Sequence, residues 1–193
     1  MIAFLKGEFV SKTPASVQID VNGVGYEVQI SLHTYTKIQQ LERGILYTHL
    51  IVREDAHLLF GFYDPAEKEM FQLLIGVSGI GASTARVVLS CLKPEELTRA
   101  ILQPDMRVLE GVKGIGKKTA ERLVLELRDK LSKHPVEPNI SPLTNNTLQQ
   151  DALNALTALG INRLAAEQAL QKVLANDPHI SVEELIKKTL RIL

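Results

Sequence analysis

The sequence predicts a mixed, multi-domain fold: a small N-terminal β-barrel, a middle all-α domain and a C-terminal three-helix bundle. Three observations predict it. Apolar and polar residues alternate over residues 1–62, helical spacing of apolar residues begins at residue 63, and a Gly-Ile-Gly motif at 79–81 returns at 114–116. A chain of 193 residues is long enough for this arrangement.

Residues 1–62 are predicted to form the barrel. Apolar residues alternate with polar ones over 17–21, and the glycine-containing segment 22–25 supplies a turn. A second hairpin is predicted from strands at 46–52 and 57–62, which a short polar turn joins. Several short strands with glycine turns in so short a segment favour a closed or nearly closed barrel.

Residues 63–133 are predicted to be helical. Asp64, Pro65 and Glu67 offer an N-cap, a proline at the first helical position and a capping-box glutamate. An amphipathic helix pattern follows each Gly-Ile-Gly motif, and the basic side chains of the segment gather around the second motif. The single cysteine, Cys91, excludes an internal disulfide, and its apolar surroundings indicate a small core residue.

The last third of the chain is predicted to be a linker followed by a bundle. Residues 134–147 carry three prolines and three asparagines, which predicts a mobile linker. Residues 148–193 show the spacing of three short helices, of which the first stops at Gly160 and the third begins at a capping box of Ser181 and Glu184. Basic residues are not in excess here, so this bundle is a poor candidate for binding nucleic acid.

Each Gly-Ile-Gly motif has the chemistry of a phosphate site. Glycines on either side of one buried aliphatic residue let the backbone turn tightly, and the turn then opens a helix. The first N–H groups of that helix have no partner within it, and the helix dipole adds positive potential there. Two copies in equivalent settings predict a unit that binds phosphates twice without reading bases.

The second motif is the stronger candidate because Lys113, Lys117, Lys118 and Arg122 surround its anion position. The competing interpretation is that these lysines are only a solvated helix start. The first motif has fewer cations nearby and is expected to contribute less affinity. The predicted DNA-binding residues are Gly79, Gly81, Ser83, Thr84, Arg86, Lys113, Gly114, Gly116, Lys117, Lys118, Thr119 and Arg122.

Catalytic and metal sites are not predicted. Gly111, Gly116 and Lys117 fit a P-loop, but Lys118 stands where a hydroxyl should hold Mg²⁺, and a Walker B strand is missing. The five histidines lack ligand spacing, so we expect neither a metal nor a cofactor. Apolar runs are too short for a membrane span, and the N-terminus lacks signal-peptide features, which predicts a cytoplasmic protein without membrane attachment.

The order of these parts resembles the RuvA family, the Holliday-junction-binding subunits of a bacterial branch-migration machine. The residues that carry the resemblance are those at 1–7, 23–28, 52–56, 59–62 and 114–123. The resemblance covers the whole chain. One departure is the pair Ala82-Ser83, where family members often carry a basic pair after the first hairpin; Ser83, Thr84 and Arg86 are therefore proposed as substitutes.

The resemblance implies an OB-fold barrel, two helix-hairpin-helix motifs and a three-helix motor-binding domain. It implies a non-catalytic homotetramer that holds a four-way DNA junction open in recombination, repair and the SOS response. Glu54 and Asp55 match the family's acidic pin, which favours a DNA-repelling role over a merely solvated turn. The partner of the C-terminal bundle would be the hexameric ATPase RuvB, with the exposed apolar positions Leu156, Leu159 and Leu190 as candidate contacts. A RuvC-type resolvase would be a further partner.

Three questions stay open at this point. The first is whether one tetramer or two facing tetramers, an octamer, hold the junction. The second is whether the chain is instead a helix-hairpin-helix nuclease or glycosylase, which would need an acid or a lysine nucleophile beside the hairpins. The third is whether it is a pure protein-interaction adaptor, for which the lysines of the second hairpin would be dispensable for DNA binding.

Overall fold

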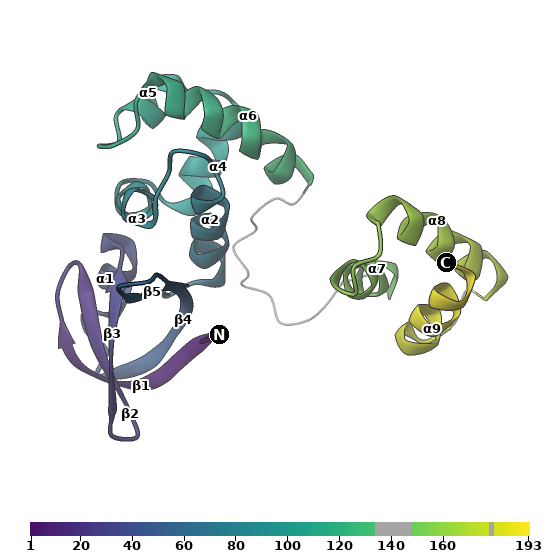
Figure 1. Cartoon of the computed structure of the whole chain (residues 1–193), viewed down its shortest axis with the longest axis horizontal. Helices are drawn as coiled ribbons and strands as arrows, with labels where there is room; N and C mark the ends of the chain where they lie inside the picture. The colour runs from purple at the N-terminus through teal and green to yellow at the C-terminus, as the bar shows by residue number, and fades with distance from the viewer. Residues whose placement is uncertain (134–147, 178–179) are drawn as a thin grey trace. The chain divides into compact units, whose positions relative to one another are not determined.

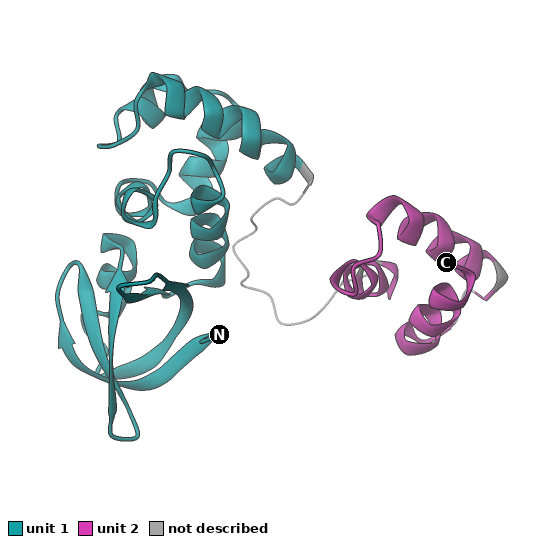
Figure 2. Ribbon diagram, viewed as in Figure 1, with its two compact units in different colours: residues 1–139 teal, residues 140–193 magenta. Residues whose placement is uncertain are grey.

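The computed structural model describes residues 1–133, 148–177 and 180–193. The chain divides into two compact units, residues 1–139 and residues 140–193 (Figure 2). The predicted linker at 134–147 lies outside the described residues.

The first unit begins with a closed barrel of five strands (Figure 1). Their order around the barrel is β1-β2-β3-β5-β4, and β4 pairs back with β1, so the sheet has no free edge. All strand pairs are antiparallel except β3 with β5, which is parallel. This closed five-strand barrel is the OB-fold predicted for this segment. The strands are β1 (Phe4–Lys12), β2 (Ser16–Val21), β3 (Val24–Ile30), β4 (Arg43–Val52) and β5 (His57–Phe62).

A short helix, α1 (Leu32–Ile38), lies between β3 and β4, where only β structure was expected from the sequence. The Ser31 side chain caps its start by accepting a hydrogen bond from the Thr34 N–H at 3.0 Å. Beyond its other end, Lys12 Nζ donates to the carbonyl oxygens of Gln39 and Leu41, at 3.0 and 2.6 Å. Such contacts satisfy polar backbone groups near the helix ends that would otherwise lack partners.

Helices make up the rest of the first unit. They are α2 (Pro65–Ile75), α3 (Ala82–Cys91), α4 (Pro94–Leu102), α5 (Met106–Glu110) and α6 (Lys117–Lys133). Phe71 of α2 stacks on two aromatic rings of β5, with centroids 5.0 Å from Phe60 and 4.9 Å from Phe62. The last barrel strand thus contributes its aromatic side chains to the core of the helical region.

The expectation for Cys91 was wrong, because this residue is exposed. Helix α3 buries Ala85, Val88 and Leu89 against the core. Cys91 is the last residue of the helix and lies two positions beyond Leu89, which turns it away from that face.

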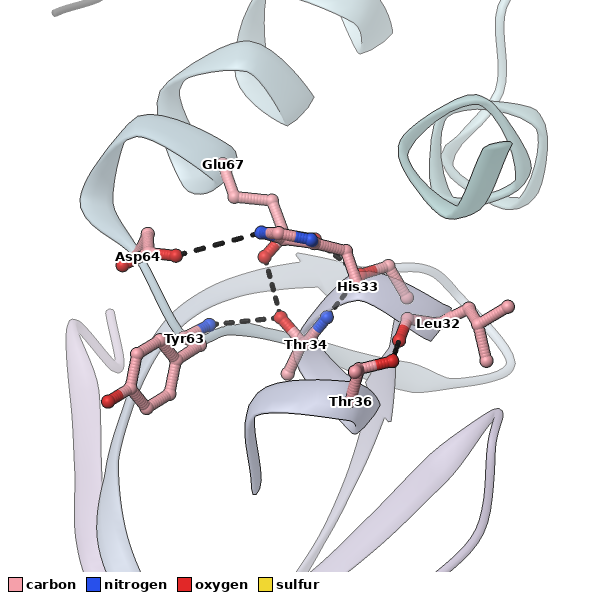
Figure 3. Close-up of polar contacts among 8 residues, drawn as sticks. Leu32, His33, Thr34, Thr36, Tyr63, Asp64 and Glu67 are labelled. Carbon is pink, nitrogen blue, oxygen red and sulfur yellow. Dashed lines mark hydrogen bonds and ion pairs between the residues drawn. The ribbon is translucent and has the colours of Figure 1, made fainter. Parts of the chain in front are cut away.

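The predicted capping box at the start of α2 was also wrong. Asp64 is the N-cap residue and Pro65 begins the helix, but the Asp64 side chain makes no cap hydrogen bond and lies 3.7 Å from His33 Nε2. Glu67 is fully buried and reaches across to α1 instead (Figure 3). One of its carboxylate oxygens accepts from Thr34 Oγ1 at 2.6 Å, and the other accepts from the Ser31 hydroxyl.

Burial raises the pKa of the Glu67 carboxyl, and the two hydroxyl hydrogen bonds oppose the rise. Thr34 Oγ1 also accepts from the Tyr63 N–H at 3.0 Å (Figure 3). The connection between β5 and α2 is therefore held on α1 at both the backbone and the side-chain level. This cluster of polar contacts fixes the helical region onto the barrel.

The second unit contains three helices, as predicted for this segment: α7 (Leu148–Ala158), α8 (Arg163–Asn176) and α9 (Val182–Ile192). Gly160, with φ at +88°, ends α7, and its N–H donates to the Thr157 carbonyl at 3.0 Å. Ser181 caps α9 by accepting from the Glu184 N–H at 3.4 Å. The core of this unit is apolar and consists of Ala152, Leu153, Leu156, Ala166, Leu170, Val173, Ile180 and Leu185.

Because Glu67 binds its proton more tightly in the folded protein, its contribution to stability is complete well below its ordinary pKa of 4.5 and is lost as the pH rises through the raised pKa. Glutamine at this position cannot titrate. We therefore predict that the free energy of unfolding of Glu67→Gln increases relative to that of the unmodified chain as the pH rises from the ordinary to the raised pKa of Glu67. The gain has a limit of about 1.4 kcal/mol per pH unit. Urea unfolding of both proteins from about pH 4 to about pH 8 measures it.

Glu69→Gln is the matched control, because Glu69 lies on the same helix and is exposed. A free-energy difference between Glu67→Gln and the unmodified chain that stays constant over the whole pH range would contradict the prediction.

Candidate nucleic-acid interface

The two Gly-Ile-Gly turns have the same backbone conformation. Gly79 and Gly114 lie in the left-handed region, with φ at +92° and +95°. The N–H of Ile80 donates to the Val77 carbonyl at 3.0 Å, and the equivalent bond of the second turn has the same length. The repeat seen in the sequence is therefore a repeat in structure, with one buried isoleucine anchoring each turn.

Each turn opens a helix in the same way. The Ala85 N–H donates to the Gly81 carbonyl, and the Ala120 N–H donates to the Gly116 carbonyl, both at 2.9 Å. A Cβ at Gly81 or Gly116 would meet no atom within 4 Å, so the backbone here faces open space. At α3, no capping side chain satisfies the first N–H groups. These groups are the donors that an incoming phosphate oxygen needs.

Three lysines surround the second turn and have no partner among the described residues. Lys113, Lys117 and Lys118 are exposed, and none makes a hydrogen bond or an ion pair with any residue of the described chain. Thr119, next to them, is half-buried. Uncompensated charge beside open N–H groups favours an anion at this position.

Arg122 has a different environment from the lysines. It is exposed, but its Nη1 donates to the carbonyl of Ser78 in the first turn at 3.1 Å, and its Nε lies 4.0 Å from Glu126. Thr84 of α3 lies beside the second turn: a Cβ at Gly114 would meet the Thr84 Cγ2 at 3.4 Å. These contacts join the two turns into one surface.

The remaining residues predicted around the first turn do not share one environment. Ser83 is exposed beside Gly81, while Thr84 is half-buried. Arg86 is also half-buried, and its Nη1 donates to the carbonyl of Ala15 in the barrel at 3.0 Å. The sequence offered no signal for this contact, since the two residues lie 71 positions apart.

The acidic turn is exposed, as its sequence position between two strands predicts. Glu54 and Asp55 lie between β4 and β5, and the turn is closed by the Arg53 N–H, which donates to the Ala56 carbonyl at 2.8 Å. Over residues 1–133, 148–177 and 180–193, no three His, Cys, Asp or Glu side chains come together in a group that could hold a metal ion.

The three leucines predicted as partner contacts fall into two groups. Leu156 is fully buried in the core of the second unit, so its assignment as an exposed contact was wrong. Leu153 and Leu156 share the inward stripe of α7 at helical spacing. Leu159 follows the end of that helix and is 64% exposed, and Leu190 on α9 is 41% exposed.

The two turns of this interface were predicted from the sequence, but the group of residues that links α1 to α2 was missed. The sequence motif was sufficient to find both turns, but Ser31, Thr34 and Glu67 were not recognised as the link between α1 and α2. Ser31 stands before a short run with Thr34 and Ile38 at helical spacing, and this pattern was the available signal.

Among the described helices, none is long and apolar enough to cross a membrane.

Comparison with protein-family models finds three matches along the chain. Residues 1–61 match the RuvA N terminal domain, residues 71–129 match the SAM-like helix-hairpin-helix tandem, and residues 147–193 match the RuvA C-terminal domain. The second match spans both Gly-Ile-Gly turns.

Full-length relatives are also similar to the chain. A protein of Christiangramia forsetii is 46% identical over 191 residues, 99% of each chain, and one of Cytophaga hutchinsonii is 43% identical over 199 residues, 100% of each. A protein of Neisseria gonorrhoeae is 46% identical over 177 residues, 90% of each chain. All three are named Holliday junction branch migration complex subunit RuvA.

We predict that Gly79→Ser and Gly114→Ser each lower the free energy of unfolding by about 1–2 kcal/mol, because a residue with a Cβ is strained at these positive φ angles. Gly81→Ser is the control: φ there is −84°, and a serine hydroxyl can cap α3, so stability is expected to stay equal or rise. Urea unfolding followed by circular dichroism measures all three. An equal loss at all three positions would contradict the assignment of strain to the turns.

Proposed function

The chain belongs to the RuvA family, and we propose that it binds four-way Holliday junctions as the non-catalytic subunit of a branch-migration complex in which RuvB is the ATPase. The observation that carries this proposal is the pair of joined turns. Each presents an open helix N-terminus, and the second is surrounded by three lysines that have no partner in the described chain.

This surface suits the DNA backbone rather than the bases. Backbone N–H groups and lysine ammonium groups bind phosphate oxygens, which are the same in every sequence. Neutralising phosphates releases counterions, so the affinity should fall steeply with added salt. The lysine-rich second turn supplies most of the affinity in this proposal, and the first turn mainly guides the path of the duplex.

The acidic turn supplies the preference for a junction. Two exposed carboxylates at Glu54 and Asp55 repel phosphates, and the repulsion is strongest where DNA is forced close to them. A homotetramer with four-fold symmetry would place four such turns at the crossover and eight hairpin turns around it. An open four-way junction relieves the repulsion by directing its four arms outward over the hairpins.

The second unit recruits the motor in this proposal. It has its own apolar core, and Leu159 and Leu190 remain exposed on it. Exposed leucines on a small helical unit are suited to contact another protein. RuvB, the ATPase of the branch-migration complex, is the partner proposed for them.

We predict that Lys117→Ala with Lys118→Ala weakens binding to a four-way junction and to a linear duplex alike. The slope of log affinity against log salt should fall by about 0.9 for each phosphate that the variant no longer neutralises. Lys130→Ala, an exposed lysine near the other end of α6, is the control and should change neither quantity. Gel-shift titrations over a salt series measure both.

Two results of these titrations would oppose the proposal. Equal affinity of the unmodified chain for junction and duplex at matched salt would remove junction selectivity. An unchanged affinity of the double lysine variant would favour the protein-interaction adaptor instead.

For the acidic turn, we predict that Glu54→Gln with Asp55→Asn preserves or tightens binding to linear duplex, because the repulsion is removed. The ratio of junction affinity to duplex affinity should therefore decrease. The same gel-shift titrations measure this ratio. Loss of duplex binding in this variant would rule out a repulsive role for the turn.

For the second unit, we predict that Leu159→Ser with Leu190→Ser leaves junction affinity unchanged and reduces the degree to which this chain stimulates the RuvB ATPase. Both side chains are exposed, so the unit should stay folded, which circular dichroism checks. Full stimulation by the folded variant would exclude these two leucines as motor contacts.

A further inference from the structure

We propose that Arg86 is a positioning residue, which holds the first hairpin turn at a fixed place relative to the barrel and its acidic turn and does not bind phosphate. The proposal deepens the function proposed above, because it names a residue on which the preference for a junction over a duplex depends. It also revises the expectation from the sequence that Arg86 replaces a missing lysine contact.

The partner of Arg86 is a backbone carbonyl that is also hydrogen-bonded within the barrel. Its Nη1 donates to the Ala15 carbonyl at 3.0 Å, and the same carbonyl accepts from the Ile30 N–H of β3 at 3.0 Å. The turn that contains Ala15 is closed by Thr13, whose side chain accepts from the Ser16 N–H at 2.9 Å. Arg86 therefore attaches α3 to a turn of the barrel that is itself held by hydrogen bonds.

Ser90 makes a second contact one helical turn later, so the two residues form a barrel-facing edge of α3. Its hydroxyl accepts from the Leu32 N–H, at the start of α1, at 3.0 Å and donates to the Arg86 carbonyl at 2.8 Å. Figure 1 shows α3 beside α1 at the top of the barrel. Since Glu67 of α2 also binds α1, both helices before and after the first turn are attached to the same element.

The environment of Arg86 differs from that of the three lysines. The lysines are exposed and make no bond to a residue that the structure describes, whereas Arg86 is half-buried and donates to a backbone carbonyl. A guanidinium carries five N–H donors, so the hydrogen bond to Ala15 leaves donors that could still bind a phosphate. The salt dependence of DNA binding therefore separates a phosphate-binding role of Arg86 from a positioning role. A side chain that neutralises a phosphate contributes to the slope of log affinity against log salt, and a positioning residue does not.

The consequence differs between the two DNA substrates. A linear duplex needs only the hairpin surface, whose two turns are joined directly by Arg122 and Thr84. A junction must satisfy the hairpins and the acidic turn at once, so it needs a fixed spacing between α3 and β4–β5. Release of α3 from the barrel should therefore weaken junction binding and spare duplex binding.

Gel-shift titrations of the full chain over a salt series compare Arg86→Ala, Ser90→Ala and Lys118→Ala. For Arg86→Ala we expect junction affinity to fall about five- to tenfold, with duplex affinity and both salt slopes unchanged. Ser90→Ala, which changes no charge, should lower the junction-to-duplex ratio in the same direction. Lys118→Ala should weaken both substrates together and lower the slope by about 0.9 for each phosphate left without its lysine.

A second measurement does not depend on DNA. Cys91 is the only cysteine of the chain and is exposed at the end of α3, so it accepts a spin label. Gln18→Cys, at an exposed position of β2, accepts another. Labelled chain diluted with unlabelled chain gives the distance distribution between α3 and the barrel. We expect a narrow distribution with Arg86 present and a broader one in Arg86→Ala.

Two results would overturn the proposal: a salt slope that falls in Arg86→Ala with equal weakening of both substrates, or a distance distribution that stays narrow in that variant. A chain without any junction preference would instead refute the proposed function, and the distance distribution would then decide the role of Arg86 by itself. Should Arg86→Ala not fold, Ser90→Ala carries both measurements.

Discussion

A buried carboxylate links the barrel to the helices in the first unit and fixes the geometry between them. Glu67 extends from α2 into a site on α1, where hydroxyl groups of Ser31 and Thr34 donate to both of its oxygens. Burying such a group without partners would be costly, and these partners reduce the cost only when α1 and α2 lie at one separation and angle. The link therefore supplies geometrical definition more than stability.

The helical region uses its charges in two ways. The lysines at the second turn are exposed and form no ion pair within the described parts of the chain, which favours long-range attraction for a polyanion. One arginine from the helix after each turn, Arg86 of α3 and Arg122 of α6, donates to a backbone carbonyl of a neighbouring element instead. The planar guanidinium, with several donors in fixed directions, suits such bridging, whereas a flexible ammonium group suits contact with mobile phosphates.

Local features of this structure were predictable from the sequence, and long-range ones were not. The two turns follow from glycines that must adopt positive φ at Gly79 and Gly114, and this requirement is visible in a few consecutive residues. Helix α1 was missed because seven residues between strands give a weak periodic signal. Glu67 was predicted to be a local cap because its real partners lie 33 and 36 positions away, and the exposure of Cys91 depends on how α3 is rotated in the fold.

The aromatic stacking of β5 on α2 has a consequence for how this protein folds and how it can be divided. Phe60 and Phe62 belong to a barrel strand, yet their rings lie in the hydrophobic cluster of the helices. A fragment that begins after residue 62 would lose both rings and leave Phe71 without its aromatic neighbours. The hairpin pair is thus no transplantable module: barrel and helices gain stability from the same side chains and should unfold in one cooperative step.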